Sequence, residues 1–322
     1  MWSRLVLWTI GVTSLAGVVT NQNVGRLNPM IRLLEADKPV FGLYAPRARQ
    51  GGRRGRGAAN APPAEVRTPM DLATETLAYT RSDYVFDGSM EGSVDGGLPA
   101  FTTLVTALRE SGARANTHPL IVKTPNIAED PARAVESISR QLSAGVSGVM
   151  FVGVESAEEV RQGLVAMRFR SKGGSRPDDV GGAPAYWGLS EAEYREKADL
   201  WPLNPDGELI NWTIVESHEG LANVREIAAV PGIGVLWPGA GTLRGLFTST
   251  NADGERELDA LAWEAAIQTV LAACKEFDVA CGYPANASDI EIRMNQGFSV
   301  FVMSWGEGGF ETIEIGRRAS GR

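Results

Sequence analysis

Apolar positions along the chain follow two alternating patterns. Short runs of aliphatic and aromatic residues predict strands, and the longer segments between them place apolar residues at helical spacing. The predicted strands cover 40–44, 82–86, 120–122, 148–152, 209–215, 233–237, 279–283 and 299–304. The predicted helices cover 28–34, 70–80, 101–111, 131–144, 157–169, 219–229, 257–277 and 288–296, with a short helix near 191–198 inside an irregular stretch, 171–205. Eight strands separated by helices predict a (β/α)8 barrel, and a doubly wound open sheet is the alternative.

The segment 209–246 carries the strongest functional signal. Its first strand delivers Glu216 at its end, and its second runs into a glycine-rich turn, 238–244. Barrels and open α/β sheets place their sites at the carboxyl ends of strands, so Glu216 is placed as a site residue. The alternative is an acid that caps the helix beginning at Ser217. The turn misses the dinucleotide-binding glycine spacing and favours backbone amides that face a small anion, such as a carboxylate.

Length and charge limit the domain organisation and the partners. A chain of 322 residues is long enough for one barrel, which typically needs roughly 250 residues. We expect the barrel at 28–310, a basic Gly/Arg-rich insertion within it at 46–67, and a C-terminal tail at 311–322. A net charge of −8 with 43% hydrophobic residues indicates a globular protein without general affinity for nucleic acid.

The insertion differs from the rest of the chain in charge. It carries Arg47, Arg49, Arg53, Arg54 and Arg56 among Gly, Ala and Pro, with no apolar periodicity. Such composition predicts a solvated, loosely ordered loop. The alternative is an RNA-binding tract, whose affinity for RNA would fall with added salt. In an acidic protein the solvated loop is the better interpretation, so we expect no nucleic-acid partner.

The first residues resemble a secretory signal. Arg4 precedes an apolar run at 5–19, and the small residues at 14–16 offer a cleavage site. We therefore expect a signal peptide at 1–22 and an exported protein, periplasmic or secreted, that does not associate with the membrane after cleavage. The alternative is an uncleaved anchor, although the run is shorter than the ~20 residues that span a bilayer comfortably.

Cysteine and histidine are scarce. Cys274 and Cys281 are too few for a disulfide framework, and without clustered histidines they do not predict a zinc site. His118 and His218 are the two histidines of the chain. A histidine-rich metal centre is therefore excluded.

Several local motifs, in order, resemble one known family. The chain is similar to the HpcH/HpaI aldolase/citrate lyase family, which comprises pyruvate-dependent class II aldolases on a phosphoenolpyruvate/pyruvate-type TIM barrel. The matching segments are Asn28-Pro29 with the strand at 40–43, Tyr84-Val85-Phe86-Asp87-Gly88-Ser89-Met90-Glu91, Leu120-Ile121-Val122-Lys123, 145–150 with Ser156-Ala157-Glu158-Glu159, Ile214-Val215-Glu216-Ser217, and Gly239-Ala240-Gly241-Thr242-Leu243.

The resemblance implies a carbon–carbon lyase. Such an aldolase would cleave a 4-hydroxy-2-oxo acid or a related oxo acid through a metal-stabilised enolate and release pyruvate or a similar keto acid. It implies Glu216 as a ligand of a divalent metal, Mg²⁺ or Mn²⁺, with Lys123 and Asp87 as catalytic residues. The substrate would meet Trp237 and the backbone amides of a segment formed by Gly239, Ala240, Gly241 and Thr242. The partners implied are a small-molecule keto acid and further copies of the chain, because members of the family exchange a C-terminal helix within homo-oligomers.

Three positions depart from the family pattern. Thr242 stands where the second metal carboxylate belongs, Met90 where a histidine belongs, and Lys123 where an arginine belongs. Threonine is a poor ligand for Mg²⁺ compared with a carboxylate, and methionine cannot carry a proton. Another acid, Asp87 or Glu91, would have to complete the metal site. The alternative is a catalytically altered barrel that binds an organic acid without metal-dependent turnover.

Overall fold

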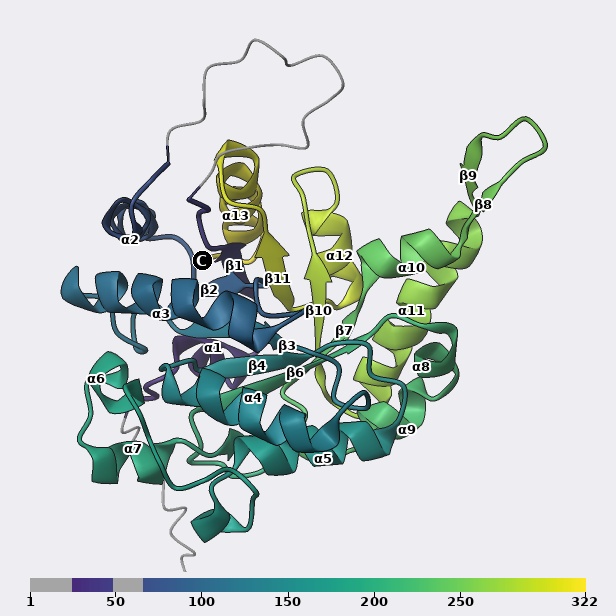
Figure 1. The fold of residues 1–322 in the computed structure, drawn as a ribbon. Coiled ribbons are helices and arrows are strands. Elements are labelled where there is room, and N and C mark those ends of the chain that lie inside the picture. The colour runs from purple at the N-terminus through teal and green to yellow at the C-terminus, as the bar shows by residue number, and fades with distance from the viewer. Residues whose placement is uncertain (1–24, 49–65) are drawn as a thin grey trace, which may run out of the picture.

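A computed structural model describes residues 25–48 and 66–322, and within them eight parallel strands close into a barrel. The barrel strands are β1 Val40–Tyr44, β2 Tyr84–Asp87, β3 Leu120–Thr124, β4 Gly148–Phe151, β6 Leu209–Val215, β7 Val235–Pro238, β10 Ala280–Pro284 and β11 Val300–Met303. The barrel closes where β1 pairs with β11 and where β4 pairs with β6. The predicted (β/α)8 barrel is therefore confirmed (Figure 1).

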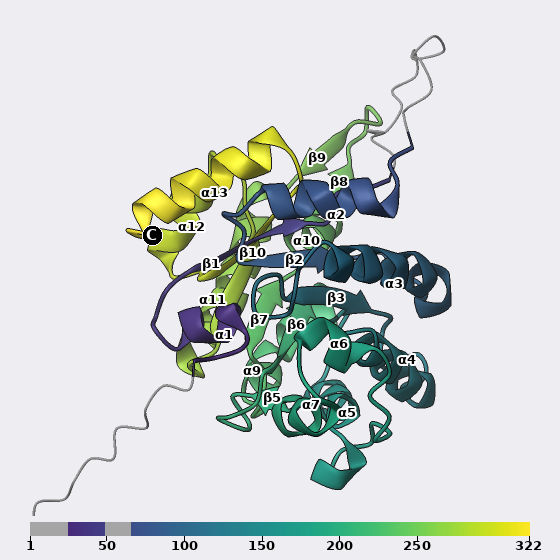
Figure 2. The same ribbon diagram turned by 90° about the vertical axis from the view of Figure 1, so that its left-hand side faces the viewer.

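Helices follow the strands and cover the outside of the barrel, as Figure 2 shows. They are α2 Pro69–Ala78, α3 Val94–Glu110, α4 Pro131–Ser143, α5 Ala157–Met167, α8 His218–Ala222, α9 Val224–Ala228, α10 Ala240–Leu246, α11 Ala260–Glu276, α12 Ile290–Gln296 and α13 Glu307–Ala319. Helix α3 begins earlier than predicted because the Ser93 hydroxyl accepts a hydrogen bond from the Gly96 amide and caps it. None of the helices described is long and apolar enough to cross a membrane.

Three predicted elements differ in the structure. The helix expected at 219–229 is split, because Asn223 ends α8 and begins α9 while its side chain donates to the Glu155 carbonyl. The glycine-rich turn is the start of helix α10. The C-terminal tail expected at 311–322 lies largely in α13, which packs on β1 and β11 of the same chain. Adjacent glycines at 308–309 obscured this helix in the sequence pattern.

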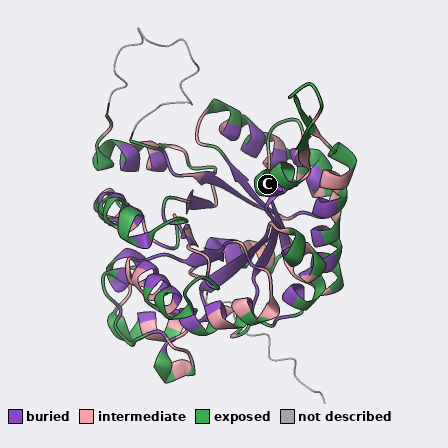
Figure 3. Cartoon of the chain, turned by 45° about the vertical axis from the view of Figure 1, so that its right-hand side comes forward, coloured by how far each residue is buried: buried purple, intermediate pink, exposed green. Residues whose placement is uncertain are grey.

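The barrel interior is rich in aromatic side chains. Trp212 lies at its centre, stacked on Phe86 and Trp237 with ring centroids 5.8 and 5.2 Å apart. The Tyr84 ring packs directly against Gly42. A Cβ at position 42 would lie 2.2 Å from that ring, so only glycine leaves room for it. Side chains at alternate strand positions therefore fill the centre of the barrel. Figure 3 shows the barrel strands coloured as buried.

Helix α1, Pro29–Leu34, packs beside the beginnings of the strands. Asn28 caps it, because its side chain accepts a hydrogen bond from the Met30 amide at 3.0 Å. Met30 and Ile31 are fully buried in the same interior cluster as Val40 and Ile210. Apolar packing therefore closes this end of the barrel. An open site can form only at the other end, where the carboxyl ends of the strands lie.

The irregular stretch at 171–205 contains more structure than its composition predicted. It holds the 3₁₀ turn η1 Arg170–Lys172, the helices α6 Ala183–Trp187 and α7 Glu191–Lys197, and the short strand β5 Leu200–Trp201. Strand β5 adds a ninth, parallel strand to the edge of β6 outside the closed barrel. Buried Asp199 anchors it through an ion pair with Arg168 at 2.7 Å.

Two further features were missed by the sequence pattern. A hairpin of β8 Thr248–Thr250 and β9 Arg256–Leu258 projects between α10 and α11 (Figure 1). A disulfide joins Cys274 near the end of α11 to Cys281 in β10, and both residues are buried. The two cysteines form this single cross-link and no larger framework.

Candidate active site

A pocket of about 210 Å³ opens at the carboxyl ends of the barrel strands. Its lining residues come from the ends of β1, β2, β3, β4, β6, β7, β10 and β11 and from the start of α10. They are Tyr44, Phe86, Lys123, Met150, Ile214, Glu216, Trp237, Gly239, Ala240, Gly241, Thr242, Pro284 and Val302. We call this the mouth pocket. It contains every residue that the sequence singled out as a site residue except Asp87 and the alternative acid Glu91.

Lys123 projects into the mouth pocket from β3. Its backbone carbonyl accepts a hydrogen bond from the buried amide of Gln141 at 2.8 Å, which fixes the end of the strand. Its ammonium lies 2.9 Å from a carboxylate oxygen of Glu91, and 15% of the Lys123 side chain is exposed, compared with 46% for Glu91. The lysine is therefore mostly shielded from water and reaches one carboxylate.

Glu216 is held at the end of β6 by a backbone contact. Its Oε1 accepts a hydrogen bond from the Gly153 amide at 3.0 Å, and its Oε2 accepts none from the described residues. Room for this carboxylate depends on Gly239, where a Cβ would lie 2.4 Å from Glu216 Cβ and 2.8 Å from Oε2. The Ser217 hydroxyl accepts from the Gly220 amide and caps α8. Glu216 is therefore not the helix cap.

The segment 239–242 reaches the pocket as the start of a helix. The Gly239 amide donates to the Val215 carbonyl at 2.9 Å, so it is not available to a ligand, contrary to our expectation. The amides of Ala240, Gly241 and Thr242 lie in the first turn of α10, where backbone donors have no partner within the helix. Thr242 is exposed and contributes a hydroxyl at the edge of the pocket.

Asp87 and Met90 lie outside the mouth pocket. Asp87 accepts a hydrogen bond from the Ser89 amide at 2.7 Å and so shapes the turn that carries Glu91 back to Lys123. Met90 is fully buried against Gly97, with its sulfur 3.7 Å from the Gln141 side-chain nitrogen. Met90 therefore packs between the strands and the outer helices, and it does not contact a ligand in this pocket.

The floor of the mouth pocket is aromatic. Tyr44, Phe86 and Trp237 line it, with Tyr44 packed edge-on against Phe86 at 4.8 Å between ring centroids. Burial raises the pKa of the Tyr44 phenol above its ordinary value, and the nearby Lys123 ammonium opposes this rise. Sequence reasoning did not single out Tyr44 or Phe86. Their positions at strand ends were the available signal, because such positions face the mouth of a barrel.

The donors in the mouth pocket do not match a resident divalent metal. Glu216 is the one carboxylate among the lining residues, and the other side-chain oxygens of the lining are the hydroxyls of Tyr44 and Thr242. No cluster of three His, Cys, Asp or Glu residues that could hold a metal occurs in the part of the chain that the structure describes. Mg²⁺ is usually held by one or two carboxylates together with water and substrate oxygens, and here Glu216 is the only carboxylate of the lining, while Glu91 is bonded to Lys123.

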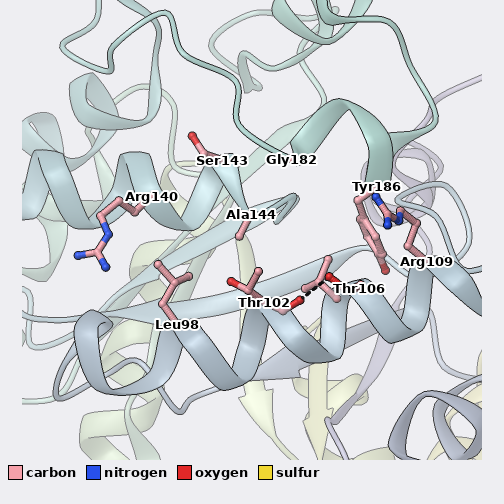
Figure 4. A pocket seen from close by; sticks show the side chains of 10 residues that line it. Leu98, Thr102, Thr106, Arg109, Arg140, Ser143, Ala144, Gly182 and Tyr186 are labelled. Carbon is pink, nitrogen blue, oxygen red and sulfur yellow. Dashed lines mark hydrogen bonds between the residues drawn. The ribbon is translucent and has the colours of Figure 1, made fainter. Parts of the chain in front are cut away.

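A second concavity lies on the outside of the barrel, between α3, α4 and α6. This outer groove has a volume of about 290 Å³ and is lined by Leu98, Thr102, Val105, Thr106, Arg109, Arg140, Ser143, Ala144, Gly182 and Tyr186. Figure 4 shows Arg109 and Arg140 at its two ends. Arg140 pairs with Asp95 at 2.6 Å. The groove thus has two cations on an apolar floor, but no carboxylate or amine lines it.

Comparisons with known proteins agree with the barrel fold. Hydroxypyruvate/pyruvate aldolase of Paraburkholderia phytofirmans is 24% identical over 285 residues, which cover 86% of this chain and 91% of that protein. A solved HpcH/HpaI aldolase/citrate lyase family protein from Burkholderia cenocepacia superposes with a TM-score of 0.61 at 20% identity, covering 91% of this chain and 97% of that one. Macrophomate synthase superposes with a TM-score of 0.59 at 18% identity, covering 92% and 88%.

A protein-family model matches the chain as well. The sequence model described as HpcH/HpaI aldolase/citrate lyase matches residues 75–303, which is well over half of the chain. The match runs from α2 to the end of the last barrel strand and includes Lys123 and Glu216. The chain therefore belongs to the HpcH/HpaI aldolase/citrate lyase family, a family of aldolases and lyases.

Proposed function

We propose that the protein is a carbon–carbon lyase that cleaves a 4-hydroxy-2-oxo acid, or a related oxo acid, to pyruvate or a similar keto acid and an aldehyde. The observation that carries this proposal is that one pocket at the mouth of the barrel presents both a cation, Lys123, and a carboxylate, Glu216. Membership of the family supports it. The name of the Paraburkholderia relative, a pyruvate aldolase, supports it as well.

The two charged groups match the two requirements of the reaction. When the C3–C4 bond breaks, its electron pair moves onto the oxo acid and negative charge develops on the 2-oxo oxygen. The Lys123 ammonium would stabilise that charge in a pocket that is largely shielded from water. The 4-hydroxyl must lose its proton as the aldehyde forms, and the Oε2 of Glu216, with no other donor among the described residues, would accept it.

A metal-stabilised form of this reaction was the expectation from the resemblance, with Glu216 holding Mg²⁺ or Mn²⁺. The pocket supplies one carboxylate where such a site needs more oxygen ligands. In the proposed reaction, Lys123 therefore stabilises the enolate.

We also propose that the protein is exported and forms homo-oligomers. The apolar run at 5–19 supports export, although the signal peptide at 1–22 and residues 49–65 of the basic insertion lie outside the described residues. The buried disulfide supports it too, because disulfides persist in oxidising compartments. Mass spectrometry should find a mature chain that starts between residues 17 and 23. An intact Met1 on a cytoplasmic protein would reject export.

Cleavage of a simple 4-hydroxy-2-oxo acid tests the proposed activity. Purified protein is incubated with the racemic acid, and the released pyruvate is measured by a coupled dehydrogenase. We expect pyruvate and aldehyde in equal amounts. A protein whose thermal midpoint rises with pyruvate but which releases no product would be the binding protein considered above, and that result would reject the lyase.

A further inference from the structure

The hydroxyl of Tyr44 differs from the other tyrosine hydroxyls of the protein. The chain has six tyrosines. The hydroxyls of the other five take part in hydrogen bonds to the protein, at Tyr79, Tyr84, Tyr186, Tyr194 and Tyr283. The Tyr44 hydroxyl has no such partner among the described residues, and Tyr44 lines the mouth pocket. A polar group at a pocket wall that has no partner in the protein is available to a ligand.

The alternation of side chains along β1 directs Tyr44 into the mouth pocket. Val40 is buried in the interior cluster of the barrel, and Gly42 faces an aromatic ring of the same cluster. Side chains of a strand alternate between its two faces, so Tyr44 is the last interior position of β1. The Ala45 amide donates to the Phe86 carbonyl at 2.8 Å and fixes this end of the strand. Tyr44 is therefore held at the rim by the strand pairing.

Tyr44 and Lys123 approach each other above Gly88. Lys123 follows Ile121 of the interior cluster by two residues, so its side chain also faces the interior. A Cβ at Gly88 would lie 3.7 Å from the Lys123 Cδ and 3.7 Å from the Tyr44 Cε1. Cε1 is the ring carbon next to the one that carries the hydroxyl. The phenol and the ammonium therefore lie on one side of the pocket, and Glu216 follows a strand further round the barrel.

Both groups can donate a hydrogen bond at neutral pH. Lys123 is an ammonium paired with Glu91. Burial raises the pKa of the Tyr44 phenol above its ordinary value, which is about 10, so the phenol keeps its proton. Breaking the C3–C4 bond places negative charge on the 2-oxo oxygen, and enzymes stabilise such an oxygen with donors that are already in position.

We propose that the Tyr44 phenol donates a hydrogen bond to the 2-oxo oxygen of the substrate and forms an oxyanion hole with the Lys123 ammonium. This inference rests on the proposed lyase function and adds a catalytic residue to it. The proton stays on the phenol throughout the reaction. The hydrogen bond strengthens as the oxygen gains charge, so Tyr44 acts on turnover more than on binding of the substrate.

Removing the hydroxyl alone tests this proposal. Tyr44→Phe keeps the ring that packs against Phe86, so thermal unfolding should stay close to that of the wild type. In cleavage of the racemic 4-hydroxy-2-oxo acid, kcat should fall on the order of 10²-fold, the usual loss for one oxyanion donor. KM should change little, because the lost interaction forms in the transition state.

Tyr283→Phe is the matched control. Tyr283 lies in β10, one residue before Pro284 at the rim, but its hydroxyl accepts from Arg293 at 3.2 Å and does not line the mouth pocket. This variant also removes one tyrosine hydroxyl from a barrel strand. It should keep the kcat and KM of the wild type.

Binding of oxalate measures the same interaction without turnover. Oxalate is a planar dianion that resembles the enolate of pyruvate, so it should use the oxyanion hole more fully than pyruvate does. Calorimetry should find oxalate bound about 10-fold more weakly by Tyr44→Phe than by the wild type, since a hydrogen bond to a charged group is lost. Pyruvate should bind equally to both. Equal oxalate affinity in the two proteins, or none in the wild type, would overturn the oxyanion hole.

A double variant tests whether the two donors share one oxygen. Groups that act on the same atom are coupled, so Tyr44→Phe combined with Lys123→Met should lose less turnover than the product of the two single losses. A loss equal to that product would show that Tyr44 and Lys123 act on different atoms and would contradict the proposal.

The outcomes distinguish this inference from the function on which it rests. A Tyr44→Phe protein with the kcat of the wild type, or with a raised KM alone, would overturn the oxyanion role of Tyr44 and leave the lyase standing. Wild-type protein that cleaves no 4-hydroxy-2-oxo acid would reject the proposed function itself, and this inference with it.

Discussion

The mouth pocket is smaller than the outer groove, yet it is the one of the two that holds both a shielded cation and a carboxylate. The outer groove has about 290 Å³ and the mouth pocket about 210 Å³. Both carry cations, but Arg140 in the groove is 39% exposed and pairs with Asp95 at the surface, whereas Lys123 in the mouth is 15% exposed. Shielding from water strengthens the interaction of a charge with a reacting group. The mouth also holds Glu216, while the groove holds no acid.

The cause of this difference lies in the barrel. Parallel strands that end at one rim bring side chains from distant parts of the sequence into one pocket, as Lys123 of β3 and Glu216 after β6 show. The groove is made by three helices, α3, α4 and α6, and the Thr106 hydroxyl in it is satisfied locally, because it donates to the Thr102 carbonyl of the same helix (Figure 4). We expect substitutions in the two regions to differ accordingly.

The largest effect should come from removing the cation of the mouth. Lys123→Met should lower cleavage on the order of 10³-fold, because the charge developing on the substrate oxygen loses its partner. The matched substitution in the groove, Arg140→Met, removes an exposed ion pair that contributes little to stability and should leave cleavage unchanged. Steady-state rates of both variants check this, and equal losses in the two would remove the distinction between the regions.

Removing the charge of Glu216 should have the next largest effect. Glu216→Gln should lower turnover on the order of 10²-fold, because the 4-hydroxyl proton loses its acceptor. The glutamine carbonyl can still accept from the Gly153 amide, so the free energy of unfolding should change by about 1 kcal/mol or less. Rates and urea unfolding measured on the same preparation check both parts. Near-native turnover would remove Glu216 from the site.

Two glycines of one segment give a matched pair. Gly239→Ala places a Cβ 2.4 Å from Glu216 Cβ, and relief of that clash should cost ~1–3 kcal/mol of stability and displace the carboxylate. Gly241→Ala meets nothing within 4 Å, so it should retain both stability and turnover. Thermal unfolding and rates of the two variants check this. A stable, active Gly239→Ala protein would show that the Glu216 carboxylate is not held as described.

Introducing an acid at Thr242 tests the assignment of the missing metal ligand, and its expected effect is the smallest. Thr242→Asp should tighten Mg²⁺ or Mn²⁺ binding by about 10-fold or more, since even indirect partners of a metal are worth ~10–100-fold in affinity. Thr102→Asp in the outer groove should not, because no carboxylate lines that groove. Calorimetric titration of the wild type and both variants measures the change. A tight metal site in the wild type would contradict the donor set described here.

The barrel could be predicted from sequence because each of its strands is a short run made mostly of apolar residues. The hydrophobic pattern did not predict two helices, α10 and α13, because both contain glycines, which are unusual inside helices. The hairpin β8–β9 is exposed and lacks a buried face. The position of such elements is set by packing against the barrel, and no local periodicity reports it.

The site could be predicted in part for a related reason. Lys123, Glu216 and Trp237 end strands, and a strand end at the rim is readable from the sequence. Asp87 also ends a strand, but its side chain turns back to the Ser89 amide, a choice made by the local loop. The same loop buries Met90 and brings Glu91 to Lys123. The spacing of residues along the sequence does not predict which strand a loop residue such as Glu91 will contact.

Exchange of the methyl protons of pyruvate with deuterated water, followed by NMR, tests the central claim most directly. Enolate formation at the mouth pocket must release a proton from this methyl group, and the measurement needs no knowledge of the natural aldehyde. We predict exchange with the wild-type protein in the presence of EDTA, unchanged exchange with Arg140→Met, and loss of exchange with Lys123→Met. Wild-type protein that catalyses no exchange, either with EDTA or with added Mn²⁺, would contradict the account.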